Sequence, residues 1–132
     1  MVAALAAGVY AYRHRPIRLP TDDPTGMTIS IAAEYGSKDP PFSVTIHDAT
    51  QIRQFLVLLK TGRGNTDHKC VDRGTIVLKY NNTEVRIDFL PGHNPRHYEL
   101  RYNRNNFRIE RNKFVEELKK LGVPAEKIPL SC

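Results

Sequence analysis

The residue types best suited to chemistry in this sequence are cysteine and histidine, which gather in two polar stretches. His68 and Cys70 are one residue apart in the first stretch, and His93 and His97 are three residues apart in the second. Zinc and copper accept thiolate and imidazole ligands, so these four residues form a candidate metal site. The spacing matches no tight zinc signature, so ligation requires the two loops to meet at one end of a sheet. No other cofactor is expected.

The two cysteines offer a second chemistry. In an oxidising compartment, Cys70 and Cys132 are expected to form a disulfide that ties the C-terminal tail to the loop around Cys70. Pro124 and Pro129 prevent the tail from extending a helix, so it must run along the surface. The alternatives are two unpaired thiols in a cytosolic protein, or a Cys70–His93 nucleophile pair, which no oxyanion-hole pattern accompanies.

Acidic residues on neighbouring strands suggest a third chemistry. Asp88, followed by Glu99 and Arg101, is similar to the D…E-x-K arrangement with which some nucleases bind magnesium. Arg101 stands at the lysine position, and arginine cannot act as a base at ordinary pH. All three residues fall on the strand phase expected to face water, where cross-strand charge pairs account for them.

Cations and aromatic residues alternate between residues 96 and 120. Such a surface can bind single-stranded nucleic acid when both kinds of side chain share one exposed face. Here the aromatic residues follow the apolar phase and the arginines follow the polar phase, so a nucleic-acid partner is not favoured. The arginines of the polar face and its loops are instead candidates for contact with a protein partner: Arg86, Arg96, Arg101 and Arg108.

Composition limits the class of protein. A chain of 132 residues suffices for one domain. With 40% hydrophobic and 26% charged residues, it is neither a disordered tail nor a multi-span membrane protein. It contains no phosphate-binding loop, dinucleotide fingerprint, H-E-x-x-H or G-x-S-x-G motif. Half of the net charge of +6 comes from Arg13, Arg15 and Arg18, so the remaining surface has an ordinary charge balance.

The first 18 residues form an apolar segment followed by a basic one. Residues 1–12 carry no charge, but a helix needs about 20 apolar residues to span a bilayer. The segment is the end of a membrane anchor, an atypical export signal, or a helix that packs on the domain or frays. Tyrosines followed by cations are typical of a membrane interface and favour attachment or export, with orientation left open. Residues 1–18 are expected to be dispensable for the fold, and residues 19–26 to be a linker.

Residues 27–132 are expected to form a single α+β domain. Alternating apolar residues predict strands at 27–35, 42–46, 76–80, 85–89, 98–102 and 107–109, with Asn81 and Asn82 in a tight turn. Apolar residues at helical spacing predict helices after Asp48 and up to Gly122. The expected order is ββ-α-ββββ-α, an antiparallel sheet with two helices packed on its apolar face. Leu100 is expected in the core and Arg101 in water.

Two short motifs, His68-Lys69-Cys70 and Leu90-Pro91-Gly92-His93, carry a resemblance. Residues 27–132 resemble small bacterial proteins of uncharacterised function that have an N-terminal anchor or signal and a body built around these motifs. The resemblance implies membrane attachment and implies no catalytic residue. The expected function is therefore a non-catalytic binding or interaction domain of a membrane-anchored or exported protein of the cell envelope. Its contact surfaces would be the charged sheet face and the His93 loop, and the alternatives are metal binding and nucleic-acid binding.

Overall fold

The computed structural model describes residues 2–33, 36–65 and 70–132, so the predicted ligand His68 lies outside the described residues. The strands are β1 (Gly26–Ile31), β2 (Phe42–Ile46), β3 (Arg63–Gly64), β4 (Gly74–Lys79), β5 (Glu84–Pro91), β6 (His97–Tyr102) and β7 (Asn105–Glu110). The helices are α1 (Val2–His14), α2 (Ala49–Leu59) and α3 (Arg111–Lys120), with a short 3₁₀ helix, η1 (Ala125–Lys127).

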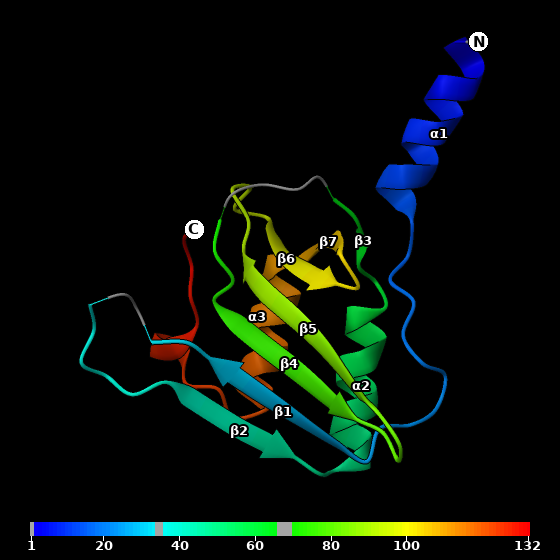
Figure 1. Cartoon of the computed structure of the whole chain (residues 1–132). Helices are drawn as coiled ribbons and strands as arrows, with labels where there is room; N and C mark the ends of the chain where they lie inside the picture. Colours follow the sequence, from blue (N-terminus) through cyan, green and yellow to red (C-terminus); the bar gives the residue numbers. More distant parts are fainter. Residues whose placement is uncertain (1, 34–35, 66–69) are drawn as a thin grey trace.

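The strands form one antiparallel sheet of seven strands in the order β2-β1-β4-β5-β6-β7-β3 (Figure 1). The α+β class and the antiparallel sheet are thus as predicted. The predicted order is incomplete, because it lacks α1, β3 and η1. Strand β3 has two residues, which is too short to show an alternating pattern, and it becomes a strand only by pairing with β7. Strand β1 also ends at Ile31, earlier than the alternation predicted, and Tyr35 lies outside the described residues.

Helices α2 and α3 cover one face of the sheet, whereas α1 projects away from it (Figure 1). The Asp48 side chain accepts a hydrogen bond of 2.9 Å from the backbone N–H of Gln51 and so begins α2 as the sequence predicted. The two helices and the central strands meet in an aromatic cluster, in which the rings of Tyr98 and Phe114 lie 5.1 Å apart. The other rings of this buried cluster are Phe55 and Phe89.

The opposite face of the sheet is partly covered, which corrects the expectation that its polar residues all face water. Glu99 is only 5% exposed, and Leu90, its cross-strand partner, is fully buried. The connection between β3 and β4 reaches this face at both of its described ends. Asn65 donates a hydrogen bond of 2.9 Å to Glu99, and Arg101 donates one of the same length to Asp72. Periodicity cannot report this cover, because the described residues of the connection, 65 and 70–73, lie outside any strand or helix.

The tightest turn of the meander lies between β6 and β7. Asn103 and Arg104 have φ angles of 51° and 63° and form a two-residue connection, for which positive φ at both positions is typical. The tight turn predicted at Asn81 and Asn82 is also present: these two residues lie between Tyr80 and Thr83, which are joined by a 2.8 Å bond from Tyr80 N–H to the Thr83 carbonyl. Neither of these asparagines has a positive φ angle.

The segment that follows α1 joins the edge of the sheet. Pro16 forms an isolated bridge with Arg63, and the Arg15 carbonyl accepts a 3.0 Å bond from Gly64 N–H. The Arg15 guanidinium lies over the Phe107 ring, and Ile17 is 4% exposed within the core. The core therefore includes a residue that the predicted segment 1–18 left outside the domain. In the described part of the chain, no helix is both long enough and apolar enough to cross a membrane.

Two truncations separate α1 from the segment behind it. Removing residues 1–13 is expected to leave the melting temperature within a few degrees, because the helix is exposed. Removing residues 1–18 takes Ile17 out of the core and is expected to lower the free energy of unfolding by about 2–5 kcal/mol. Chemical denaturation of both shortened chains measures the difference. Equal stability of the two would mean that Arg15 to Ile17 contribute nothing to the fold.

Candidate functional site

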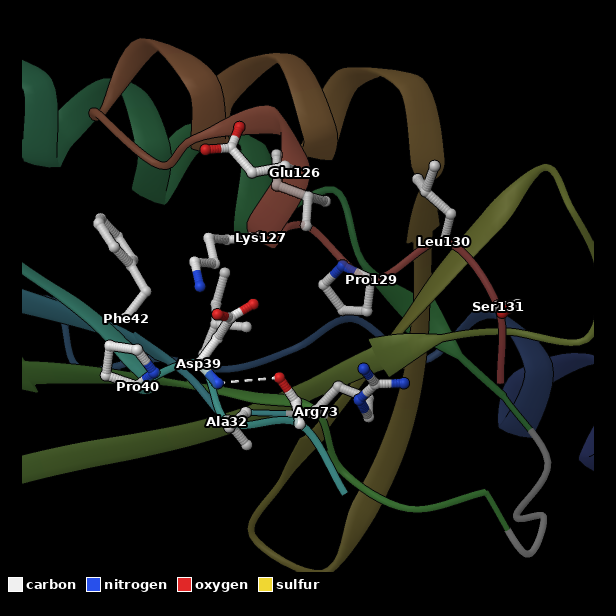
Figure 2. A pocket seen from close by; sticks show the side chains of 14 residues that line it. Ala32, Asp39, Pro40, Phe42, Arg73, Glu126, Lys127, Pro129, Leu130 and Ser131 are labelled. Atoms are coloured by element: carbon white, nitrogen blue, oxygen red, sulfur yellow. Dashed lines mark hydrogen bonds between the residues drawn. The ribbon is translucent and has the colours of Figure 1, made fainter. Parts of the chain in front are cut away.

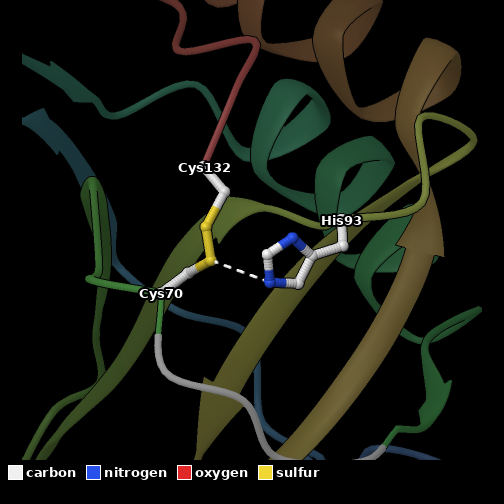
Figure 3. A group of neighbouring side chains, drawn as sticks. All are labelled: Cys70, His93 and Cys132. Atoms are coloured by element: carbon white, nitrogen blue, oxygen red, sulfur yellow. Dashed lines mark hydrogen bonds between the residues drawn. A yellow bond between two sulfur atoms is a disulfide. The ribbon is translucent and has the colours of Figure 1, made fainter.

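Cys70 and Cys132 are joined by a disulfide, as the sequence predicted (Figure 3). Their Cα atoms lie 5.8 Å apart, within the usual range for a bridge, and the cysteines are separated by 62 positions in the sequence. The bond ties the C-terminal tail to the segment that enters β4. The disulfide therefore links the C-terminal tail to the loop around Cys70, the two segments that the sequence predicted it would join.

His93 lies against this disulfide. Its Nε2 atom is 3.3 Å from Cys70 Sγ, and the three potential ligand atoms of Cys70, His93 and Cys132 all lie within 4.8 Å of one another. Cys70 is half-buried, and the other two residues are exposed. The structure thus brings together two of the four predicted metal ligands. It adds Cys132, which sequence reasoning treated only as a disulfide partner because a chain end orients poorly.

His97 is not part of this cluster. Its imidazole is partly buried and lies near three arginines, Arg96, Arg108 and Arg111. Burial, followed by these positive charges, lowers the pKa of His97 below its ordinary value, and Glu110 opposes the shift. Positive neighbours also disfavour a bound cation. The prediction of His97 as a ligand therefore has no support in the geometry.

The lowered pKa of His97 predicts a pH-dependent stability. As the pH falls through the ordinary histidine range, the unfolded chain takes up a proton at His97 before the folded chain does. The free energy of unfolding should therefore decrease in that window, and His97→Gln should remove this part of the decrease. Urea denaturation of both proteins at about pH 8 and about pH 5 measures it. A stability difference between them that is independent of pH would contradict the expectation.

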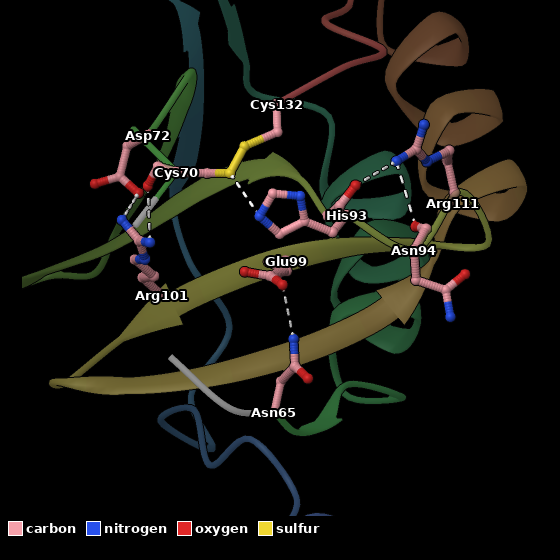
Figure 4. Close-up of a disulfide and its surroundings, with 10 residues drawn as sticks. Asn65, Cys70, Asp72, His93, Asn94, Glu99, Arg101, Arg111 and Cys132 are labelled. Atoms are coloured by element: carbon pink, nitrogen blue, oxygen red, sulfur yellow. Dashed lines mark hydrogen bonds and ion pairs between the residues drawn. A yellow bond between two sulfur atoms is a disulfide. The ribbon is translucent and has the colours of Figure 1, made fainter. Parts of the chain in front are cut away.

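Arg101 holds the segment that carries Cys70. Its guanidinium donates to the Cys70 carbonyl oxygen and to Asp72 Oδ1, each at 2.9 Å (Figure 4). The side chain is 25% exposed, so this charge pair is partly shielded from water. Arg101 was predicted to face water as a contact residue. Its contacts with Asp72 and the Cys70 carbonyl instead make Arg101 a residue that positions the disulfide.

Arg111, the first residue of α3, holds both the His93 loop and the C-terminal tail. Its guanidinium donates to the carbonyl oxygens of Gly92 at 3.0 Å and Leu130 at 2.7 Å. It also donates to the His97 carbonyl and lies over the Tyr98 ring. One side chain thereby fixes the segments on which His93 and Cys132 lie. In the sequence, Arg111 is only one of several cations between residues 96 and 120, so this role was not predicted.

The tail has further anchors that do not depend on the disulfide. The buried Tyr98 hydroxyl donates a hydrogen bond to the Pro129 carbonyl, and Ile128 is 5% exposed. Burial raises the pKa of Tyr98 to about 12, so the hydroxyl keeps its proton and stays a donor. The Leu130 side chain is 62% exposed, and this residue is held through its carbonyl oxygen, which accepts a hydrogen bond from Arg111. Cys132 therefore lies near Cys70 for reasons besides the bond between them.

A cavity of about 290 Å³ lies beneath this tail (Figure 2). Its walls come from the end of β1 and the following loop, from Arg73, and from the tail itself. Arg73 and Lys127 contribute positive charge, whereas Asp39 and Glu126 contribute negative charge. The volume is at the lower end of those that hold small molecules. The mixed charge favours neither an anionic nor a cationic ligand.

The four arginines predicted as a contact surface lie in different surroundings. Arg86 is 70% exposed and pairs with Asp88 at 3.1 Å, and Arg96 is exposed in the His93 loop. Arg108 is half-buried and donates to the Gly64 carbonyl. Arg108 and Arg101 therefore both make hydrogen bonds within the protein. The exposed part of the predicted surface is therefore reduced to Arg86 and Arg96.

Compared with protein-family models, curated proteins and solved structures, the chain matches none. The resemblance carried by the H-K-C and L-P-G-H motifs therefore stays a prediction. Within those motifs, the structure places Cys70 and His93 in direct contact. The function has to be argued from that geometry.

Proposed function

We propose that this protein is a non-catalytic binding domain of a membrane-attached or exported protein. Its ligand is a thiophilic metal ion, Zn²⁺ or Cu⁺, bound when the Cys70–Cys132 disulfide is reduced. The observation that carries the proposal is the convergence of two sulfur atoms and one imidazole nitrogen within 4.8 Å. Thiolate and imidazole are the ligands that these ions prefer. A protein partner, contacting Arg86, Arg96 and the His93 loop, fits the same class of binding domain.

The spacing of the ligand atoms suits zinc. Tetrahedral zinc with sulfur at about 2.3 Å and nitrogen at about 2.0 Å brings those two ligands to about 3.5 Å of each other. The separation of 3.3 Å between His93 Nε2 and Cys70 Sγ is close to that value. After reduction, the two sulfurs need a separation of about 3.8 Å, a small movement of the exposed Cys132 side chain. Three protein ligands leave a fourth position for water, as in other open zinc sites.

The supporting contacts keep the ligands together without the disulfide. Arg101 holds the Cys70 backbone, and Arg111 holds both the His93 loop and the tail. None of these hydrogen bonds uses a sulfur atom. The reduced protein is therefore expected to present a largely formed site, which lowers the ordering cost of binding a metal.

Cobalt titration tests metal binding. The protein is reduced with a phosphine, the phosphine is removed under nitrogen, and Co²⁺ is added as a spectroscopic substitute for Zn²⁺. We expect the visible bands of tetrahedral thiolate-bound Co²⁺, lost again when Zn²⁺ is added. His93→Ala should weaken metal binding at least about tenfold, since replacing even a residue that only hydrogen-bonds a metal ligand lowers metal affinity by that factor. His97→Ala is the matched control and should bind like the wild type.

Two results would contradict the metal proposal. The first is a reduced wild type that binds Co²⁺ and Zn²⁺ no more tightly than the Cys70→Ser/Cys132→Ser variant. The second is equal binding by the oxidised protein, because a disulfide offers no thiolate ligands.

Membrane attachment or export rests on different features. Helix α1 exposes Leu5, Val9 and Tyr10, and disulfides persist mainly in oxidising compartments outside the cytosol. Flotation with vesicles of phosphatidylcholine and phosphatidylglycerol tests attachment. We expect the full chain to float and a chain lacking residues 1–13 to remain at the bottom. Equal recovery of both chains in the bottom fraction would contradict attachment through α1.

A further inference from the structure

The two sulfur atoms of the disulfide have unequal surroundings. Cys132 is exposed, whereas Cys70 is half-buried and in contact with His93 Nε2 at 3.3 Å. The Cys70 segment is held by Arg101 (Figure 4), and the Cys132 tail is held by Arg111 and Tyr98. A thiolate that approaches from solvent therefore has easier access to Cys132 than to Cys70.

Thiol–disulfide exchange depends on that difference. A thiolate attacks one sulfur, and the other sulfur leaves as a thiolate. Access favours attack on Cys132, and a sulfur that is better stabilised as a thiolate leaves faster. His93 Nε2, which lies 3.3 Å from Cys70 Sγ, is placed to donate a hydrogen bond to the departing thiolate. Both factors select the same direction of cleavage.

We propose that the Cys70–Cys132 bond is an exchanging disulfide of fixed polarity, with Cys132 as the attacked sulfur and Cys70 as the leaving thiolate. The substrate class is an exposed dithiol on a partner protein. This inference goes beyond the proposed metal binding and requires no metal.

The reaction balances in two steps. One thiolate of the dithiol bonds to Cys132 Sγ, the Cys70–Cys132 bond breaks, and its electron pair goes to Cys70 Sγ, which takes a proton from water. The second thiolate of the dithiol then attacks its partner sulfur in the mixed disulfide and releases Cys132 as a thiolate, which takes a proton from water. Overall, the dithiol is oxidised to a disulfide, and the protein disulfide is reduced to two thiols.

The anchored tail makes the exchange reversible. After cleavage, the hydrogen bonds to the Pro129 and Leu130 carbonyls keep Cys132 close to Cys70. A nearby thiolate can attack a mixed disulfide at Cys132 and close the ring again. The tail thereby supplies a high local concentration of one sulfur near the other.

Peptide mapping tests the polarity directly. The oxidised full chain is mixed with glutathione in the presence of a metal chelator, quenched with acid at early times and digested. We expect glutathione on the peptide that contains Cys132. Equal labelling of both cysteines, or labelling of Cys70 first, would overturn the proposal. The chelator ensures that a failure of metal binding does not affect this result.

A kinetic measurement tests the role of His93. Reduction of the oxidised protein by dithiothreitol should be about tenfold slower for His93→Gln than for the wild type, since the leaving thiolate loses its partner. His97→Gln is the matched control and should react at the wild-type rate. Melting of each oxidised variant verifies folding. Unchanged reduction by a folded His93→Gln would overturn the assignment of His93, and the peptide map tests the polarity even if that variant fails to fold.

Discussion

Replacing Leu100 by alanine is expected to lower the free energy of unfolding by about 2–5 kcal/mol. Leu100 is fully buried at the centre of β6, where it pairs with Phe89 on one side and Phe107 on the other. The aromatic neighbours cannot collapse fully into the space, so a cavity remains. Urea denaturation with a two-state fit measures the change.

Arg101→Ala is the comparison for this variant. It was expected to stay near the small effects of exposed residues, but its contacts with Asp72 and the Cys70 carbonyl revise that expectation to about 1–2 kcal/mol. Leu100→Ala should still cost more. A larger loss in Arg101→Ala would mean that the anchored loop, rather than the aromatic core, dominates the stability of this region.

Removing the disulfide is expected to lower the free energy of unfolding by about 2–4 kcal/mol. The bond links cysteines 62 positions apart, so it strongly restricts the unfolded chain. Cys70→Ser/Cys132→Ser should keep the folded tail in place, because Tyr98 and Arg111 still bind it. Denaturation of this variant and of oxidised and reduced wild type measures the effect.

The reduced wild type is the control for the serine substitutions and should match the double variant in the absence of metal. Stability within about 0.5 kcal/mol of the oxidised wild type would contradict the expectation, since changes of that size are ordinary for surface substitutions. Mass after alkylation verifies the redox state of each sample.

The core could be predicted from the sequence because alternation and helical spacing report which face of a regular element is apolar. Ile29, Ile76 and Ile87 are fully buried on the face that their phase predicted, and Asp48 begins α2 as expected. The same reasoning failed for Glu99. Its phase was correct, but the face was covered by a connection that has no period.

The site itself was decided by the tertiary structure. His68, Cys70, His93 and His97 were equivalent candidates in the sequence, and spacing could not show which of them converge. Contact between Cys70 and His93 requires the segment before β4 to meet the loop after β5, and Cys132 joins them because Tyr98 and Arg111 hold its tail. The contacts that hold these segments, made by Arg101, Arg111 and Tyr98, reach backbone carbonyl groups, which every residue carries and no side-chain pattern reveals. Residue chemistry therefore limited the candidate ligands to cysteine and histidine, whereas the folded loops brought together, among the described residues, Cys70, His93 and Cys132.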